Sequence, residues 1–65
     1  MQAYQQRVID EKNELDAKRY ALGTFKNLDT FALLPWQEQE RLNTQAHLMT
    51  MYSAVLGERI ANFED

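Results

Sequence analysis

The sequence predicts an all-α protein, an antiparallel helical hairpin with a short helical turn between its two long helices. Three observations predict this fold. Glycine occurs twice and proline once in 65 residues, so the chain has few helix breakers. Apolar side chains recur at spacings of three and four residues, whereas the period-two alternation that marks strands is not sustained. The single proline, Pro35, stands between the two apolar-periodic stretches.

The first long helix of this single domain, which spans 1–65, is expected over about residues 2–23. One row of its side chains recurs every seven residues: Met1, Val8, Leu15 and Leu22. The matching second row is polar in its middle: Tyr4, Glu11, Lys18 and Phe25. Gly23 and Thr24 weaken the end of this helix, because both residue types have low helix propensity. The helix is therefore expected to end between Leu22 and Asn27.

A short helical turn is expected over residues 29–34. The side chain of Asp29 can cap this turn. Pro35 then suits the first position of the second long helix, where its missing N–H costs nothing. Glu38 and Glu40 follow near the positive end of that helix dipole, which favours acidic side chains. The turn therefore separates two helices that can pack as a hairpin.

The second long helix is expected over about residues 35–62, and its apolar pattern is the strongest in the chain. A heptad seam alternates by four and three residues: Leu42, Ala46, Met49, Ser53, Leu56, Ile60 and Phe63. A second apolar stripe lies beside the seam: Leu48, Met51, Tyr52 and Val55. A third row contains only small side chains: Thr50, Ala54, Gly57 and Ala61.

The second helix is apolar over roughly 220° of its circumference, whereas packing against one neighbour needs a stripe a little over about 100° wide. The first helix can cover the seam alone. We therefore expect the chain to assemble into a helical-bundle dimer or higher oligomer, with a dimer favoured. The predicted self-association or partner interface comprises Leu48, Met51, Tyr52, Val55 and Arg59. The alternative is a lone hairpin with an exposed apolar surface.

Composition argues against several classes of function. The chain has no cysteine and a single histidine, so no disulfide, metal site or cofactor is expected. Ten acidic and seven basic residues give a net charge of −3, which argues against nucleic acid as a partner. No apolar run approaches the ~20 residues of a membrane span, so no membrane association is expected. The N-terminal stretch lacks the apolar core of a signal peptide, and a cytoplasmic location follows as an expectation.

No catalytic residues are expected, and the chain is not expected to be an enzyme. His47 falls on the polar side of the second helix, without the partner that general acid–base catalysis needs. Ser53 lies on the seam, where its hydroxyl is expected to donate to a carbonyl of its own helix rather than to attack a substrate.

Two further groups of side chains are candidates for binding. Phe31 and Trp36 are one candidate, a partner hot spot at the hairpin end, since tryptophan is enriched in such positions. The alternative is that Trp36 closes the hairpin end against Phe25 and Phe31. Lys18, Arg19 and Lys26 form a basic cluster that could hold an anionic ligand. The alternative is that these cations only complement the dipole at the end of the first helix.

Two stretches resemble a known family: "YQQRVIDEKNELDAK" at 4–18 and "LPWQEQERLNTQAHLMTMYSAVLGERIANF" at 34–63. The shared pattern falls on Tyr4, Gln5, Arg7, Val8, Asp10, Glu11, Lys12, Leu15, Asp16, Phe31, Leu34, Pro35, Glu38, Gln39, Leu42, Met49, Tyr52, Ser53, Leu56, Arg59 and Ile60. On this pattern the chain resembles the small accessory proteins of the crAss-like-phage-related helical-hairpin family, found in temperate phages. It departs from the pattern at residues 19–20 and 22–24. The resemblance implies a phage-encoded accessory protein acting in the cytoplasm of the infected bacterial host.

Two functions follow as expectations. In the first, the protein binds a host protein through a helical surface and inhibits or redirects it, for counter-defence or host takeover. In the second, it assembles into an oligomeric sponge that binds cyclic-nucleotide immune signals through the basic cluster.

Overall fold

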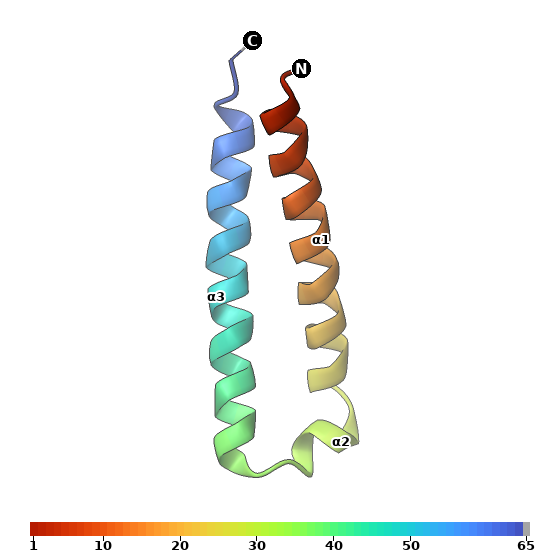
Figure 1. Cartoon of the computed structure of the whole chain (residues 1–65). Coiled ribbons are helices and arrows are strands. Elements are labelled where there is room, and N and C mark those ends of the chain that lie inside the picture. The colour runs from red at the N-terminus through yellow and green to blue at the C-terminus, as the bar shows by residue number, and fades with distance from the viewer. Residues whose placement is uncertain (65) are drawn as a thin grey trace.

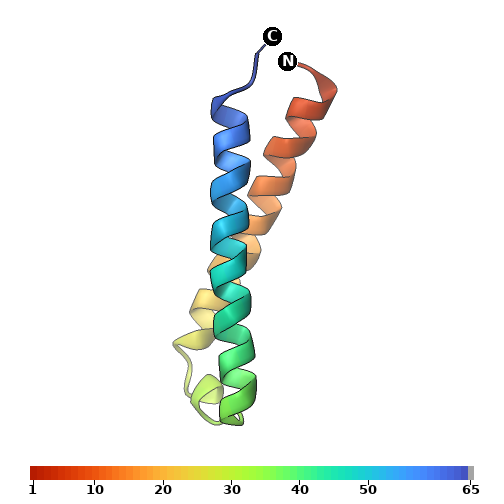
Figure 2. The same ribbon diagram turned by 90° about the vertical axis from the view of Figure 1, so that its left-hand side faces the viewer.

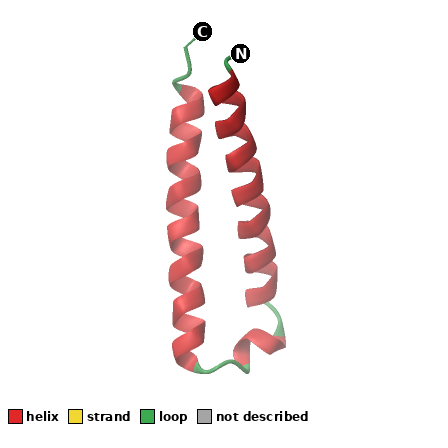
Figure 3. Cartoon of the chain, viewed as in Figure 1, coloured by secondary structure: helices red, strands yellow, loops and turns green. Residues whose placement is uncertain are grey.

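The computed structural model describes residues 1–64, and it is a hairpin of two long helices. Helix α1 spans Ala3–Lys26, α2 spans Asp29–Ala32 and α3 spans Trp36–Ala61. The long helices lie side by side and antiparallel, with both termini at one end and α2 at the other (Figure 1). Across these residues the ribbon consists of helices and loops, with no strand (Figure 3). The predicted all-α hairpin is therefore confirmed.

Helix α1 passes through Gly23 and Thr24 and ends at Lys26, within the predicted interval from Leu22 to Asn27. The final turn is retained because Phe25 packs edge-on against Phe31, with the ring centroids 5.9 Å apart. This contact offsets the low helix propensity of the preceding glycine.

The N-cap residues of α2 and α3 each lie one position away from the prediction. Leu28, rather than Asp29, occupies the N-cap position of α2, and Asp29 makes no side-chain cap. Asp29 is instead the first residue of α2, where its negative charge interacts favourably with the positive end of the helix dipole. Pro35 is the N-cap residue of α3 rather than its first helical residue, so the helix begins at Trp36, one residue later than predicted. Its fixed φ and absent N–H suit the start of a helix equally well there.

The predicted seam of α3 is confirmed along its whole length. We call its side chains the inner face of α3; all are buried or half-buried: Leu42, Ala46, Met49, Ser53, Leu56, Ile60 and Phe63. Leu56 is only 1% exposed. Near the termini the ring of Phe63 meets Tyr4 edge-on at 5.8 Å. The spacing of three and four residues thus identified the side of α3 that α1 covers.

The rows of α1 that face α3 differ partly from the prediction. Val8 is buried and Leu15 and Leu22 are half-buried, but Met1 is exposed. The predicted second row is only partly covered, since Tyr4 and Lys18 are exposed. The row that lies beside the valine and leucines is instead Gln5, Lys12, Arg19 and Lys26, again spaced by seven residues. Polar side chains therefore alternate with apolar ones along the covered side of α1.

The molecule is a rod with a thin core. It measures 49 × 15 × 13 Å, and its radius of gyration is 15.0 Å. A compact domain of this length is expected to have a radius of gyration of about 11 Å. Seen after a 90° turn, α1 crosses behind α3 at an oblique angle (Figure 2). Within residues 1–64, Val8 and Leu56 are the only buried apolar side chains. None of the helices described is long and apolar enough to cross a membrane.

Candidate binding surfaces

The first candidate surface is the side of α3 that α1 leaves uncovered. We call Leu48, Met51, Tyr52 and Val55 the outer face; these side chains are between 45% and 59% exposed. An open hollow of about 520 Å³ lies beside them, lined by Arg41, Thr44, Gln45, Leu48, Met49 and Tyr52. Arg59, predicted with this group, is also exposed. All five residues of the predicted interface are therefore accessible in the single chain.

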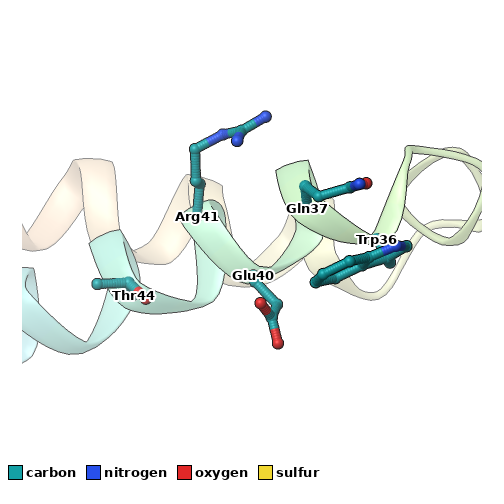
Figure 4. Close-up of a pocket in the computed structure, with 5 residues that line it drawn as sticks. All are labelled: Trp36, Gln37, Glu40, Arg41 and Thr44. Atoms are coloured by element: carbon teal, nitrogen blue, oxygen red, sulfur yellow. The ribbon is translucent and has the colours of Figure 1, made fainter.

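The second candidate surface lies at the turn and consists of Leu28, Leu33 and Trp36, which we call the turn patch. Leu33 is 82% exposed and Trp36 is 65% exposed. A hollow of about 430 Å³ is lined by Trp36, Gln37, Glu40, Arg41 and Thr44. Figure 4 shows the indole of Trp36 and the carboxylate of Glu40 on one side of the helix, with Arg41 projecting on the other.

Gln39 holds the turn patch in place. Its side-chain amide donates to the carbonyl oxygens of Leu34, at 2.8 Å, and Ala32, at 3.3 Å. These bonds connect the first turn of α3 to the end of α2. Phe31, predicted as a hot spot with Trp36, is half-buried against Phe25. The structure thus separates the two predicted residues: Phe31 supports the turn and Trp36 faces outward.

A polar cluster interrupts the interface between α1 and α3. The Ser53 hydroxyl donates to Asp16 Oδ1 at 2.6 Å, and Lys12 Nζ donates to Asp16 Oδ2 and Ser53 Oγ, both at 2.8 Å. Arg19 donates to Asp16 Oδ1 at 2.9 Å and to Thr50 Oγ1 at 3.3 Å. We call these five residues the Asp16 cluster. It contains two cations and one carboxylate, and it links both helices.

The surroundings of Asp16 stabilise its charged form. Hydrogen bonds from Lys12, Ser53 and Arg19, in that order of effect, hold the pKa of the Asp16 carboxyl well below its ordinary value. Ser53 therefore uses its hydroxyl across the interface, and the expected bond to its own helix is wrong. Thr50 makes that kind of bond instead, donating to the carbonyl of Ala46 at 3.0 Å. A charged acceptor on α1 explains why Ser53 turns away from its own helix.

The predicted basic cluster is divided between different environments. Lys18 is exposed, whereas Lys26 is half-buried in the row that borders α3. Arg19 is engaged by Asp16 and Thr50, but its Nε atom is buried without a partner among the residues described. A hollow of about 300 Å³ lies beside it, lined by Asp16, Arg19 and the exposed Tyr20. Arg19 is thus the member of the cluster that lies at a hollow.

The sequence-based reasoning missed Lys12 and Asp16 as partners of Ser53. The signal for Lys12 was present in the spacing, because Gln5, Lys12, Arg19 and Lys26 are seven residues apart. A search for apolar periodicity alone passes over such a row. In the part of the chain that the structure describes, no three metal-ligating side chains come together. The arrangement therefore offers apolar surfaces and a charged cluster on a helical hairpin.

Comparison with known proteins places the chain in a family. No curated protein and no solved structure matches it. The model of one protein family, described as Sequestin, matches residues 2–62, which include all three helices. The match includes the outer face, the turn patch and the Asp16 cluster. This chain belongs to the Sequestin family.

Proposed function

We propose that this protein is a non-catalytic sequestering protein, which binds a partner stoichiometrically and withholds it from its normal interactions. The name of the family supports sequestration. The exposed apolar side chains of the turn patch and outer face support binding through surface contacts.

The partner that we propose is a host protein in a bacterium infected by the phage that encodes this chain. One observation carries this choice: Trp36 and Leu33 are the most exposed apolar side chains of the turn, and Gln39 fixes the backbone that presents them. Large apolar side chains that are already held in position lose little conformational freedom on binding. Such residues are typical anchors of protein interfaces.

The turn patch would inhibit or redirect the host protein by occupying an apolar pocket on it. Trp36 and Leu33 would fill that pocket, while Glu40 and Arg41 stand at the edge and select a partner of complementary charge. Blocking one surface of a host protein needs no catalytic residue in the blocking protein. Counter-defence or host takeover is the biological setting that we propose for this mechanism.

The test begins with affinity purification of the tagged protein from infected bacteria, followed by binding measurements with the purified host protein that is recovered. Trp36→Ala is expected to raise the Kd by about 30-fold or more, as for the loss of a binding hot spot. Gln39→Ala should weaken binding less, because it removes hydrogen bonds that hold the turn but keeps the side chains that contact the partner. Tyr20→Ala is the matched control, since Tyr20 is an exposed aromatic residue on α1. Equal binding by wild type and the Trp36 variant would contradict the proposal.

A second candidate is a sponge for cyclic-nucleotide immune signals. The observation that favours it is the hollow at Asp16, Arg19 and Tyr20. Arg19 Nε is buried without a partner within residues 1–64, and the exposed ring of Tyr20 could stack on a base. Lys18 directly precedes Arg19 on α1 and adds a second positive charge. The neighbouring carboxylate of Asp16, however, repels an anionic ligand. The turn patch therefore remains the stronger candidate.

The same variants separate the two candidates. A sponge should show a thermal shift with cyclic di- or trinucleotides, lost in Arg19→Glu and Tyr20→Ala and retained in Trp36→Ala. A protein blocker should show the reverse dependence with its host protein. Thermal shifts by cyclic nucleotides that depend on Arg19, together with unaltered host-protein binding by Trp36→Ala, would replace the first candidate by the second.

A further inference from the structure

The hollow beside the turn patch joins an aromatic ring to a carboxylate. Trp36 and Glu40 are four residues apart on α3, so their side chains project from one side of the helix on successive turns. Figure 4 shows the indole and the carboxylate together on that side. Both residues are exposed, and both line the hollow of about 430 Å³. A group that enters this hollow therefore meets an aromatic ring and a negative charge at the same time.

The rest of the chain leaves the charge of Glu40 uncompensated. The adjacent cation, Arg41, donates from Nε to Glu38 Oε1 at 2.9 Å. Figure 4 shows the Arg41 guanidinium on the opposite side of the helix from the Glu40 carboxylate. Of the ion pairs formed within residues 1–64, none includes Glu40. The charge that borders Trp36 is therefore negative and accessible to a cation from another molecule.

An arginine side chain suits this pair of groups better than other cations. A cation that lies within about 6 Å of the centre of an indole ring is attracted by the ring quadrupole, and tryptophan attracts cations more strongly than tyrosine or phenylalanine does. A guanidinium group is planar, so it stacks on the ring while its N–H groups point sideways towards a carboxylate. Two parallel N–H groups then donate to the two carboxylate oxygens, a geometry that an ammonium group cannot adopt.

We propose that Trp36 and Glu40 form a receptor for an arginine side chain of the host protein, with the guanidinium stacked on the indole and hydrogen-bonded to the carboxylate. This inference rests on the proposed function and adds the chemistry of the partner. The apolar pocket that receives the turn patch carries an arginine at its edge. The net charge of −3 on this chain attracts such a basic edge over longer distances.

The backbone of α3 holds both groups in place before the arginine arrives. Trp36 is the first residue of the helix, and Gln39 ties this first turn to the Leu34 carbonyl at 2.8 Å. The partial positive charge at the start of the helix opposes a cation, but this effect falls off within one turn. Glu38 lies in that turn and offsets it, whereas Glu40 lies beyond it. The hollow is thus a preformed site whose net field favours a cation.

The first test uses the tryptophan as its own reporter. Trp36 is the only tryptophan in the chain, so the indole N–H signal in NMR reports on this site alone. The probe is arginine blocked as its N-acetyl amide, and the matched ligand is blocked citrulline, which has the same shape without the charge. Titration at constant ionic strength should shift the indole signal with arginine and much less with citrulline.

Two variants complete the titration. Glu40→Gln should lose most of the shift caused by arginine, because the ring remains but the charge is gone. Glu14→Gln is the matched control, since Glu14 is an exposed carboxylate on α1, and it should respond as wild type. Equal responses of the wild type to the two ligands, including no response to either, would overturn the inference.

The second test uses the host protein recovered by affinity purification. Glu40→Gln should raise the Kd by about 10-fold, and Glu40→Lys should raise it further, whereas Glu14→Gln should bind as wild type. Added salt should weaken binding by the wild type more than binding by Glu40→Gln, because the variant lacks the ion pair that salt screens.

The outcomes separate this inference from the proposed function. If Trp36→Ala weakens binding while Glu40→Gln binds as Glu14→Gln does, the arginine receptor is wrong and the proposed function stands. If Trp36→Ala binds as wild type, both are wrong.

Discussion

The inner and outer faces of α3 are both rich in apolar side chains, but α1 covers only one of them. On the inner face Leu56 is 1% exposed, whereas on the outer face Leu48 is 59% exposed. The two leucines lie eight residues apart on the same helix, so helix propensity does not distinguish them. What differs is the presence of a neighbouring helix. The comparison shows that one face maintains the hairpin and the other remains available for contacts between molecules.

The largest expected effect is on the free energy of unfolding, when Leu56 and Leu48 are each truncated to alanine. Leu56→Ala should lower the free energy of unfolding by about 2–5 kcal/mol, as expected for a buried leucine that leaves a cavity. The cost should be the same at high and low protein concentration, because the contact lies within one chain. Leu48→Ala should cost less and lose its effect on dilution. Urea denaturation at two protein concentrations measures both, and equal, concentration-independent costs would abolish the distinction between the faces.

A smaller effect is expected at the polar position of the inner face. Ser53→Ala removes the hydroxyl that joins Lys12 to Asp16, and it should cost about 1–3 kcal/mol because Ser53 is buried and bonded to charged groups. Thr44→Ala is the matched control. Thr44 is exposed on α3 and lies outside the Asp16 cluster, so a change within about 0.5 kcal/mol is expected. Thermal or urea denaturation distinguishes the two variants. A cost for Ser53→Ala no larger than that for Thr44→Ala would show that the Asp16 cluster does not stabilise the interface.

The smallest expected effect is the pH dependence of the stability that Asp16 contributes. The pKa of Asp16 is lowered in the folded chain from its ordinary value of 3.8, so below that pH the unfolded chain binds more protons than the folded one. The contribution of Asp16 to stability is therefore present at neutral pH and declines as the pH falls below about 4. Asp16→Asn should be less stable than wild type at neutral pH, and the difference should narrow in acid. A difference that stays constant from neutral pH to pH 3 would contradict this role for the carboxylate.

The sequence predicted α3 better than α1, and the reason lies in the residues themselves. The inner face of α3 is apolar at six of its seven positions, so a spacing of three and four residues identifies it directly. On α1 the covered side alternates apolar residues with Gln5, Lys12, Arg19 and Lys26, and periodicity of hydrophobicity does not detect such a row. The partners of Ser53 come from residues far away in the sequence, and their positions depend on how the two helices meet.

The candidate surfaces were predictable to different degrees. The outer face follows from helix geometry, since a stripe that α1 does not face stays exposed. The separation of Phe31 from Trp36 could not be inferred, because it depends on the path of the turn and on the hydrogen bonds of Gln39. The environment of Arg19 likewise depends on Asp16 and Thr50, which lie on different helices. Local sequence patterns therefore identified exposed surfaces, whereas contacts between helices required the structure.

Sedimentation equilibrium of the wild-type protein tests most directly whether the outer face of α3 is shared with a second copy. The measured mass at micromolar concentration should be about 15.4 kDa, twice the 7.7 kDa of one chain, and should fall towards one chain on dilution. A mass of 7.7 kDa that does not change over the whole concentration range would contradict the account.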